Sequence, residues 1–138
     1  MNEQNASRPL PRVGESASRA LNFTPETVRQ YADLVGDHNP LHLDAKYAAQ
    51  TQFGRPIVHG MFVAGLISAI LGEELPGEGA IYLSQSLRFV APVYVGDTIT
   101  GTVTVTAVRP DKRLITLKTE CVNTDGSRVL IGEATVKL

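Results

Sequence analysis

The chain has 138 residues, of which 43% are hydrophobic and 20% charged, and its formal net charge is -1 at pH 7. This length fits one domain, and the composition is typical of a globular protein rather than a disordered segment. The 13 Lys and Arg against 14 Asp and Glu, without a basic run, exclude the usual pattern of a nucleic-acid-binding protein.

Three features bear on where the protein works. The longest apolar run, residues 61–71, is too short to span a bilayer, so we expect no membrane segment. Residues 1–13 are polar and lack the apolar core of a signal peptide, and we expect them to form a flexible N-terminal arm. Cys121 is the only cysteine, which excludes an internal disulfide and favours a reducing, cytoplasmic location.

The first half of the chain carries helix signals. Residues 16–23 form a short strand-like run, and Thr24 followed by a proline is a typical helix start. Apolar residues then recur at helical spacing as far as Gly36, which is suited to end the helix. Asp44 is placed to cap a second short helix. A third helix is predicted for residues 60–74; it is apolar on all faces, so we expect other structure to enclose it on most sides.

After residue 79 the pattern changes to the two-residue period of strands. Segments rich in Val, Ile, Thr and Leu, separated by turn signals, cover residues 81–90, 98–108, 114–122 and 129–138. With the early strand they predict an antiparallel sheet of about five strands curled around one buried helix, an α+β fold with residues 14–138 as a single domain. A second copy of the chain often protects the free edge of such a sheet, so we expect a homodimer.

Residues 37–42 read DHNPLH and place a carboxylate, Asp37, and an imidazole, His42, five residues apart on irregular backbone. Such a pair can hold and deprotonate a water molecule, because histidine changes its protonation state near neutral pH. The same residues could form only a turn after a helix, since Asp, Asn and Pro are common turn formers.

Gly60 starts the apolar helix and directly follows His59. The amide of a glycine at a helix start is open to an oxyanion, which the partial positive charge of the helix end stabilises. The alternative is a small residue where the helix packs closely against the sheet. We interpret His59 as a structural residue. Because the histidines form no helical i, i+4 pair and have no Cys partner, we expect no metal site.

The segments DHNPLH (37–42), RPIVHGM (55–61), YLSQSLRF (82–89) and PVYVGD (92–97) resemble the MaoC-like (R)-specific enoyl-CoA hydratases of the short, single-domain bacterial type. The resemblance runs from about residue 24 to residue 138. It implies a hot-dog fold, in which the sheet wraps around the long helix and a helical segment overhangs it. It also implies a homodimer that hydrates trans-2-enoyl-CoA reversibly to (R)-3-hydroxyacyl-CoA without a metal or redox cofactor, in fatty-acid or polyhydroxyalkanoate metabolism.

The resemblance assigns roles to the matching residues. It implies that Asp37 and His42 are the catalytic pair, that Asn39 supports them, and that the N–H of Gly60 binds the thioester oxygen. Two such groups on one side of the substrate favour syn addition of water.

Two residues of the long helix have secondary roles in this interpretation. Ser68 is implied as a polar neighbour of the catalytic pair, although most buried helical serines bond back to the preceding turn. It lies eight residues past Gly60, about 12 Å along the axis, so it cannot share the thioester oxygen with that amide. The acyl chain is expected to run along the helix past Leu71.

Three rival functions stay open on the sequence. The chain could be a dehydratase of another hydroxyacyl thioester, including one on a carrier protein. It could be an acyl-CoA thioesterase on the same fold, or an acyl-CoA-binding subunit without activity. Loss of the enoyl absorbance without release of thiol would distinguish a hydratase from a thioesterase.

Overall fold

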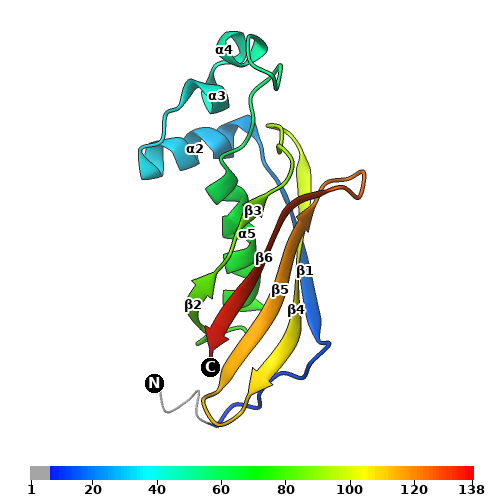
Figure 1. Ribbon diagram of the computed structural model, residues 1–138. Helices are drawn as coiled ribbons and strands as arrows, with labels where there is room; N and C mark the ends of the chain where they lie inside the picture. Colours follow the sequence, from blue (N-terminus) through cyan, green and yellow to red (C-terminus); the bar gives the residue numbers. More distant parts are fainter. Residues whose placement is uncertain (1–6) are drawn as a thin grey trace.

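The computed structural model describes residues 7–138 and shows an antiparallel sheet packed against one long helix, with three shorter helices at one end (Figure 1). The strands are β1 (Ser16–Asn22), β2 (Ile81–Gln85), β3 (Arg88–Phe89), β4 (Thr98–Arg109), β5 (Leu114–Val122) and β6 (Arg128–Lys137). Their order is β1-β4-β5-β6-β2, and β3 also pairs with β6. Among residues 7–138, no helix is both long and apolar enough to cross a membrane. The predicted α+β class is confirmed.

Strand β4 shows how one face of the sheet forms the core. Its Ile, Gly and Val positions from Ile99 to Val105 are buried, and the threonines between them are only partly buried. The long helix α5 (Gly60–Glu73) packs against this buried face, so closely that a Cβ atom added at Gly101 would lie 3.0 Å from Cδ1 of Ile70. The alternation predicted for this strand is therefore confirmed, and the sheet and α5 share one core.

The single strand predicted over residues 81–90 is instead two strands, β2 and β3. Gly132 in β6 gives the reason, because a Cβ atom there would lie only 1.9 Å from the carbonyl oxygen of Ser86. The chain thus crosses close to β6 between the two strands, where the N–H of Ser86 donates to the carbonyl of Glu133 and its hydroxyl accepts from the N–H of Glu133. The sheet has six strands rather than five as a result.

Helix α5 is buried along one side only, against the expectation that other structure encloses it on most sides. Met61, Gly65, Ser68 and Gly72 are exposed and follow one another at spacings of four and three residues, which places them on one face. Ser68, expected to be buried, belongs to this open stripe. The sequence could not reveal it, because glycine, serine and methionine do not make a polar face.

The shorter helices α2 (Pro25–Val35), α3 (Pro40–Leu43) and α4 (Ala45–Ala49) overhang the amino end of α5 (Figure 1). Their predicted ends are confirmed. Thr24 accepts a hydrogen bond from the N–H of Thr27, Gly36 ends α2 with φ 82°, and the carboxylate of Asp44 caps α4. The sequence did not predict α3 as a separate helix.

The expected flexible arm covers residues 1–13, of which residues 1–6 lie outside the described part of the chain. Two residues of the described part of this segment contact the domain. The guanidinium of Arg8 donates to the carbonyls of Pro76, at 3.1 Å, and Glu78. Leu10 packs against the core. Arg8 and Leu10 therefore contact the fold, whereas Val13 is 65% exposed.

Candidate active site

The loop after α2 carries Asp37, and hydrogen bonds within the loop fix its course. One carboxylate oxygen of Asp37 accepts the N–H of Asn39 at 3.2 Å, and the side-chain oxygen of Asn39 accepts the N–H of Leu41 at 3.1 Å. Asn39 thereby caps α3. The turn proposed as the alternative to catalysis is therefore real, and the same turn supports the carboxylate and the helix that bears His42.

His42 is fixed by a main-chain acceptor. Its Nδ1–H donates to the carbonyl of Ile57 at 2.6 Å, and its Nε2 has no hydrogen-bond partner among residues 7–138. The N–H of Ile57 donates in return to the carbonyl of Leu41. The next residue, Val58, donates to the carbonyl of Val93 at 2.7 Å, so the segment that holds His42 is anchored to the chain before β4.

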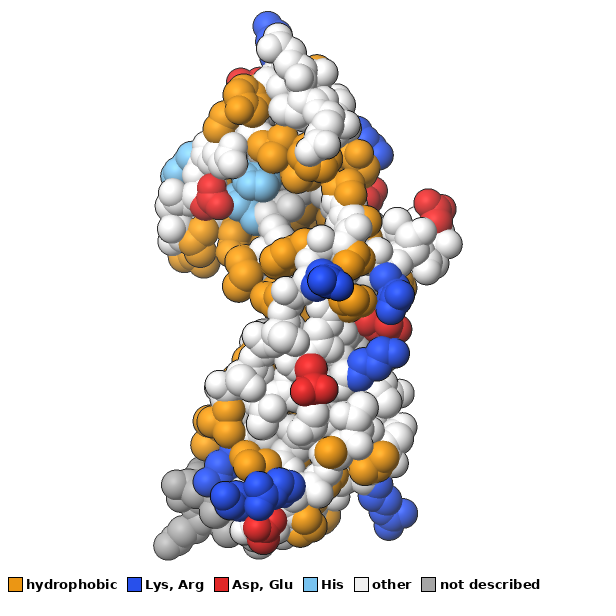
Figure 2. All heavy atoms as spheres, viewed as in Figure 1, with side chains coloured by type: hydrophobic (Ala, Val, Ile, Leu, Met, Phe, Trp, Pro, Cys, Tyr) orange, Lys and Arg blue, Asp and Glu red, His pale blue; other side chains and the backbone are white. Residues whose placement is uncertain are grey.

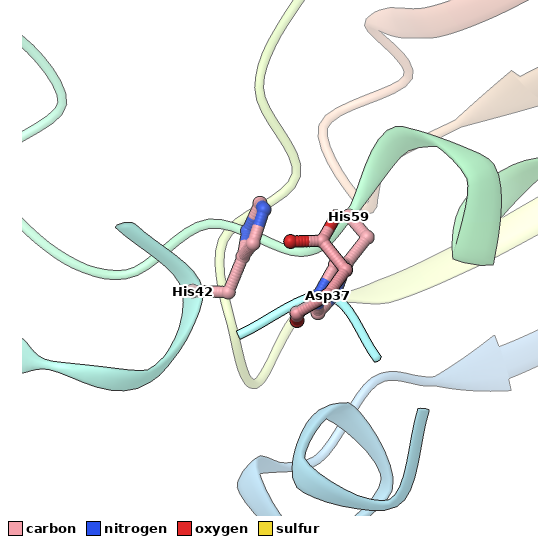
Figure 3. Close-up of side chains that lie close together, drawn as sticks. All are labelled: Asp37, His42 and His59. Carbon is pink, nitrogen blue, oxygen red and sulfur yellow. The ribbon is translucent and has the colours of Figure 1, made fainter. Parts of the chain in front are cut away.

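Asp37, His42 and His59 come together from three segments beside the amino end of α5 (Figure 3). One side-chain oxygen or nitrogen from each residue lies within 4.8 Å of the other two. Figure 2 shows histidine side chains and a carboxylate in a recess at the helical end of the molecule, rimmed by hydrophobic side chains. The structure thus brings Asp37 and His42 together, and it adds His59 to them.

His59 has the structural contacts expected of it, but the sequence did not predict that it joins Asp37 and His42. It is 3% exposed, its Nε2–H donates to the carbonyl of Asp37 at 3.1 Å, and its ring stacks on that of His42 with centroids 3.8 Å apart. Burial lowers the pKa of His59, and the hydrogen bond to the Asp37 main chain opposes this only in part. A clue was present in the sequence, since a histidine at the start of an apolar helix is costly to bury without a partner.

Asp37, His42 and His59 are also of the types that bind metal ions, so we tested whether their arrangement fits one. The lone pair of an imidazole nitrogen lies in the ring plane. Because the two rings stack with only 27° between their planes, their lone pairs lie in nearly parallel planes and cannot both point at one ion. One nitrogen of each ring is also engaged with a carbonyl. The arrangement fits a hydrogen-bonded water better than a metal ion.

The amide of Gly60 lies next to this cluster, because Gly60 follows His59 in the chain. Within residues 7–138 the Gly60 N–H has no hydrogen-bond acceptor, as is usual in the first turn of a helix. Gly60 also lines an apolar pocket of about 480 Å³, together with Phe53, Met61 and Phe89 among others. An oxygen atom in this pocket could therefore reach an open amide on the residue that follows His59.

Ser68 and Leu71 lie elsewhere. Both line a hollow of about 100 Å³ further along α5, with Tyr82 and Val136. Leu71 is 2% exposed and belongs to the core, whereas Ser68 is exposed. The structure does not place Ser68 in the Asp37–His42 cluster, but it does place it beside Leu71.

Cys121 takes no part in the site. It is fully buried in β5, and burial raises the pKa of its thiol to about 12, so that the thiol stays protonated. It is a small core side chain, as its place in the strand alternation suggested.

The chain is similar in sequence and in fold to known proteins. A family profile described as MaoC like domain matches residues 9–126. The chain is 51% identical over 126 residues to the (R)-specific enoyl-CoA hydratase of Aeromonas caviae, covering 91% of this chain and 94% of that one. It is 48% identical over 126 residues to the 3-hydroxybutyryl-CoA dehydratase of Methylorubrum extorquens, covering 91% and 80%. The solved structure of the A. caviae (R)-hydratase, described as involved in PHA biosynthesis, superposes with a TM-score of 0.91 at 50% identity, covering 93% and 97%.

Proposed function

Because the chain belongs to the MaoC-like family, we propose that it catalyses the reversible, (R)-specific hydration of trans-2-enoyl-CoA to (R)-3-hydroxyacyl-CoA. The observation that carries the proposal is the meeting of Asp37 and His42 beside the open Gly60 amide. The likeness to hydratases over most of the chain supports it. By analogy with the A. caviae protein, the metabolic setting would be fatty-acid or polyhydroxyalkanoate metabolism.

In the proposed reaction, Asp37 and His42 activate one water molecule. The free Nε2 of His42 and the carboxylate of Asp37 hold the water, and one of the two groups takes its proton as the oxygen bonds to C3 of the enoyl group. The electron pair of the C2–C3 double bond moves toward the thioester, which becomes an enolate. A proton then returns to C2 from the same side, so that one water has been added syn.

The enolate oxygen would receive a hydrogen bond from the N–H of Gly60. The partial positive charge at the amino end of α5 adds to this stabilisation, because the negative charge of the transition state develops on the enolate oxygen beside it. Proton transfers complete the reaction, which needs no oxidant or reductant. We therefore propose that the enzyme uses no redox cofactor and, on the ring geometry of the two histidines, no metal ion.

We propose that the acyl chain follows the exposed stripe of α5 from Gly60 toward the hollow at Leu71. This stripe is made of small residues at Gly65, Ser68 and Gly72, which leave room beside the helix. In this proposal Ser68 contacts the acyl chain, and Asn39 supports the catalytic pair through its cap of α3.

A second copy of the chain would close this open side, and we propose that the enzyme is a homodimer. Strand β2 is at one end of the sheet order, and Ile81, Tyr82 and Leu83 on it are 41–52% exposed. Exposed apolar residues along the open edge of a sheet favour pairing with another chain. The reducing cytoplasm is the proposed location, in keeping with the buried free thiol of Cys121.

Dehydration of a 3-hydroxyacyl thioester is the second candidate function, favoured by the similarity to the M. extorquens dehydratase. It is the same reaction in reverse and uses the same residues. Direction in the cell then depends on the relative concentrations of the two thioesters.

The test is an assay with crotonyl-CoA that records enoyl absorbance, free thiol and the chirality of the product. The proposal predicts loss of enoyl absorbance, (R)-3-hydroxybutyryl-CoA as the product, and no thiol. Release of CoA thiol would assign a thioesterase instead, and absence of any turnover with both CoA and carrier-protein substrates would leave only a binding role.

A further inference from the structure

His59 occupies a position between the two residues of the proposed catalytic pair. Its side chain bonds to the main chain of Asp37, and its ring lies on the ring of His42. On its other side, the ring of Tyr31 from α2 contacts it edge-on, with centroids 4.8 Å apart. His59 also directly precedes Gly60. It therefore touches both members of the pair and is covalently joined to the proposed oxyanion donor.

Building on the proposed hydration, we infer that His59 is a positioning residue of the reaction. Its imidazole fixes Asp37 and His42 relative to the amide of Gly60, so that the water and the thioester are held in a fixed orientation for the reaction. The residue does not exchange a proton with the substrate. It acts through the two residues that do.

The connections between segments support this role. Asp37 lies 22 residues before His59, on a loop whose other hydrogen bonds are local. The hydrogen bond from His59 ties that loop to the start of α5. His42 is tied to the same stretch of chain through the carbonyl of Ile57. Without the imidazole, Asp37 loses its link to the helix start, and His42 loses the surface on which its ring rests. A displacement of about 1 Å at reacting groups can cost about 100-fold in rate.

The protonation state of His59 fits the same role. A neutral ring with its hydrogen on Nε2 satisfies the carbonyl of Asp37, and Nδ1 is buried without a partner among residues 7–138. A second proton on Nδ1 would therefore have no acceptor. The charged or titratable groups around the ring are Asp37 and His38 in the loop, His42 in α3 and Tyr31 in α2. Burial lowers the pKa of His59, which favours the neutral ring.

Two variants separate the contacts of His59. His59→Gln keeps a donor that can reach the carbonyl of Asp37 but removes the ring. His59→Phe keeps a ring against His42 but removes the donor. We expect each to lower kcat for crotonyl-CoA by about 10- to 100-fold, with KM within about twofold of wild type. The assays are run at a temperature at which every variant is folded. Val103→Ala is the matched control, because Val103 is a fully buried core residue in β4. It should lower the melting temperature without changing kcat.

The wild-type enzyme gives a second measurement that needs no substitution. Nitrogen NMR of the histidine rings should show His59 as the neutral Nε2–H form across about pH 6–8. Three results would overturn the inference: wild-type kcat in both folded variants, a kcat loss of the same size in Val103→Ala, or a protonated His59 ring in that pH range. If neither variant folds, the NMR measurement decides. Absence of hydration by the wild type in the same assay would instead overturn the proposed function.

Discussion

The ring of Phe89 lies directly against Gly60, so that a Cβ atom added at Gly60 would come within 2.6 Å of Cε1 of that ring. The glycine that starts α5 therefore lets the Phe89 ring pack closely against the helix start. Both alternatives considered for Gly60 from the sequence, a close packing contact and an open amide, hold for the same residue.

This contact predicts the effect of Gly60→Ala. The added methyl group should push the Phe89 ring into the 480 Å³ pocket and lower kcat/KM for crotonyl-CoA by about 100-fold, without loss of the fold. Phe89 is 52% exposed, so Phe89→Ala should cost little stability. Adding Gly60→Ala to Phe89→Ala should therefore lower the activity much less than Gly60→Ala lowers it in the wild type. If Gly60→Ala lowers the activity equally in both backgrounds, the contact with Phe89 is not the cause of the loss.

The exposed edge at β2 predicts the assembly state. Wild-type protein should sediment as a dimer, and Leu83→Glu should shift it toward the monomer, because a carboxylate would have to be buried at the edge. Leu34→Glu is the matched control, since Leu34 is an 84% exposed leucine on α2. A monomeric wild type, or equal effects of both substitutions, would contradict the proposed interface.

The stacked rings of His42 and His59 predict that metal removal has no effect. Dialysis against EDTA should leave kcat for crotonyl-CoA unchanged, and added Zn²⁺ should not raise it. If activity were lost on chelation and returned with one metal ion, the cluster would have to be reinterpreted as a metal site.

The lowered pKa of His59 predicts how stability changes with pH. Its pKa in the folded state lies below the ordinary value of 6.5, so the unfolded chain binds the proton more tightly. Stability from this group is fully present above about pH 6.5 and is lost as the pH falls through the folded-state pKa. Thermal melts should show the midpoint falling below that pH, and less steeply in His59→Gln. Identical slopes in the two proteins would show that His59 does not contribute.

Local signals predicted the helices and strands well. Thr24, Gly36 and Asp44 act through neighbours a few residues away, and all three took their predicted positions. The alternation in β4 likewise reports directly which face is buried. Such signals need no knowledge of the rest of the fold.

Features that depend on distant parts of the chain could not be predicted. The break between β2 and β3 depends on Gly132, 46 residues after Ser86, and nothing near Ser86 marks it. The contact of His59 with Asp37 joins residues 22 positions apart. Sequence reasoning found Asp37 and His42 because they share one short motif, and it undervalued His59 because its partners lie elsewhere.

The most direct test of the whole account is the rate of crotonyl-CoA hydration by Asp37→Asn, which keeps the shape of the side chain but removes its charge. Asp33→Asn is the matched control, because Asp33 is an exposed carboxylate on α2 that pairs with His38. The account predicts that Asp37→Asn keeps its circular dichroism spectrum and loses about 10²- to 10⁴-fold in kcat, while Asp33→Asn remains active. A folded Asp37→Asn variant that hydrates crotonyl-CoA at the wild-type rate would contradict it.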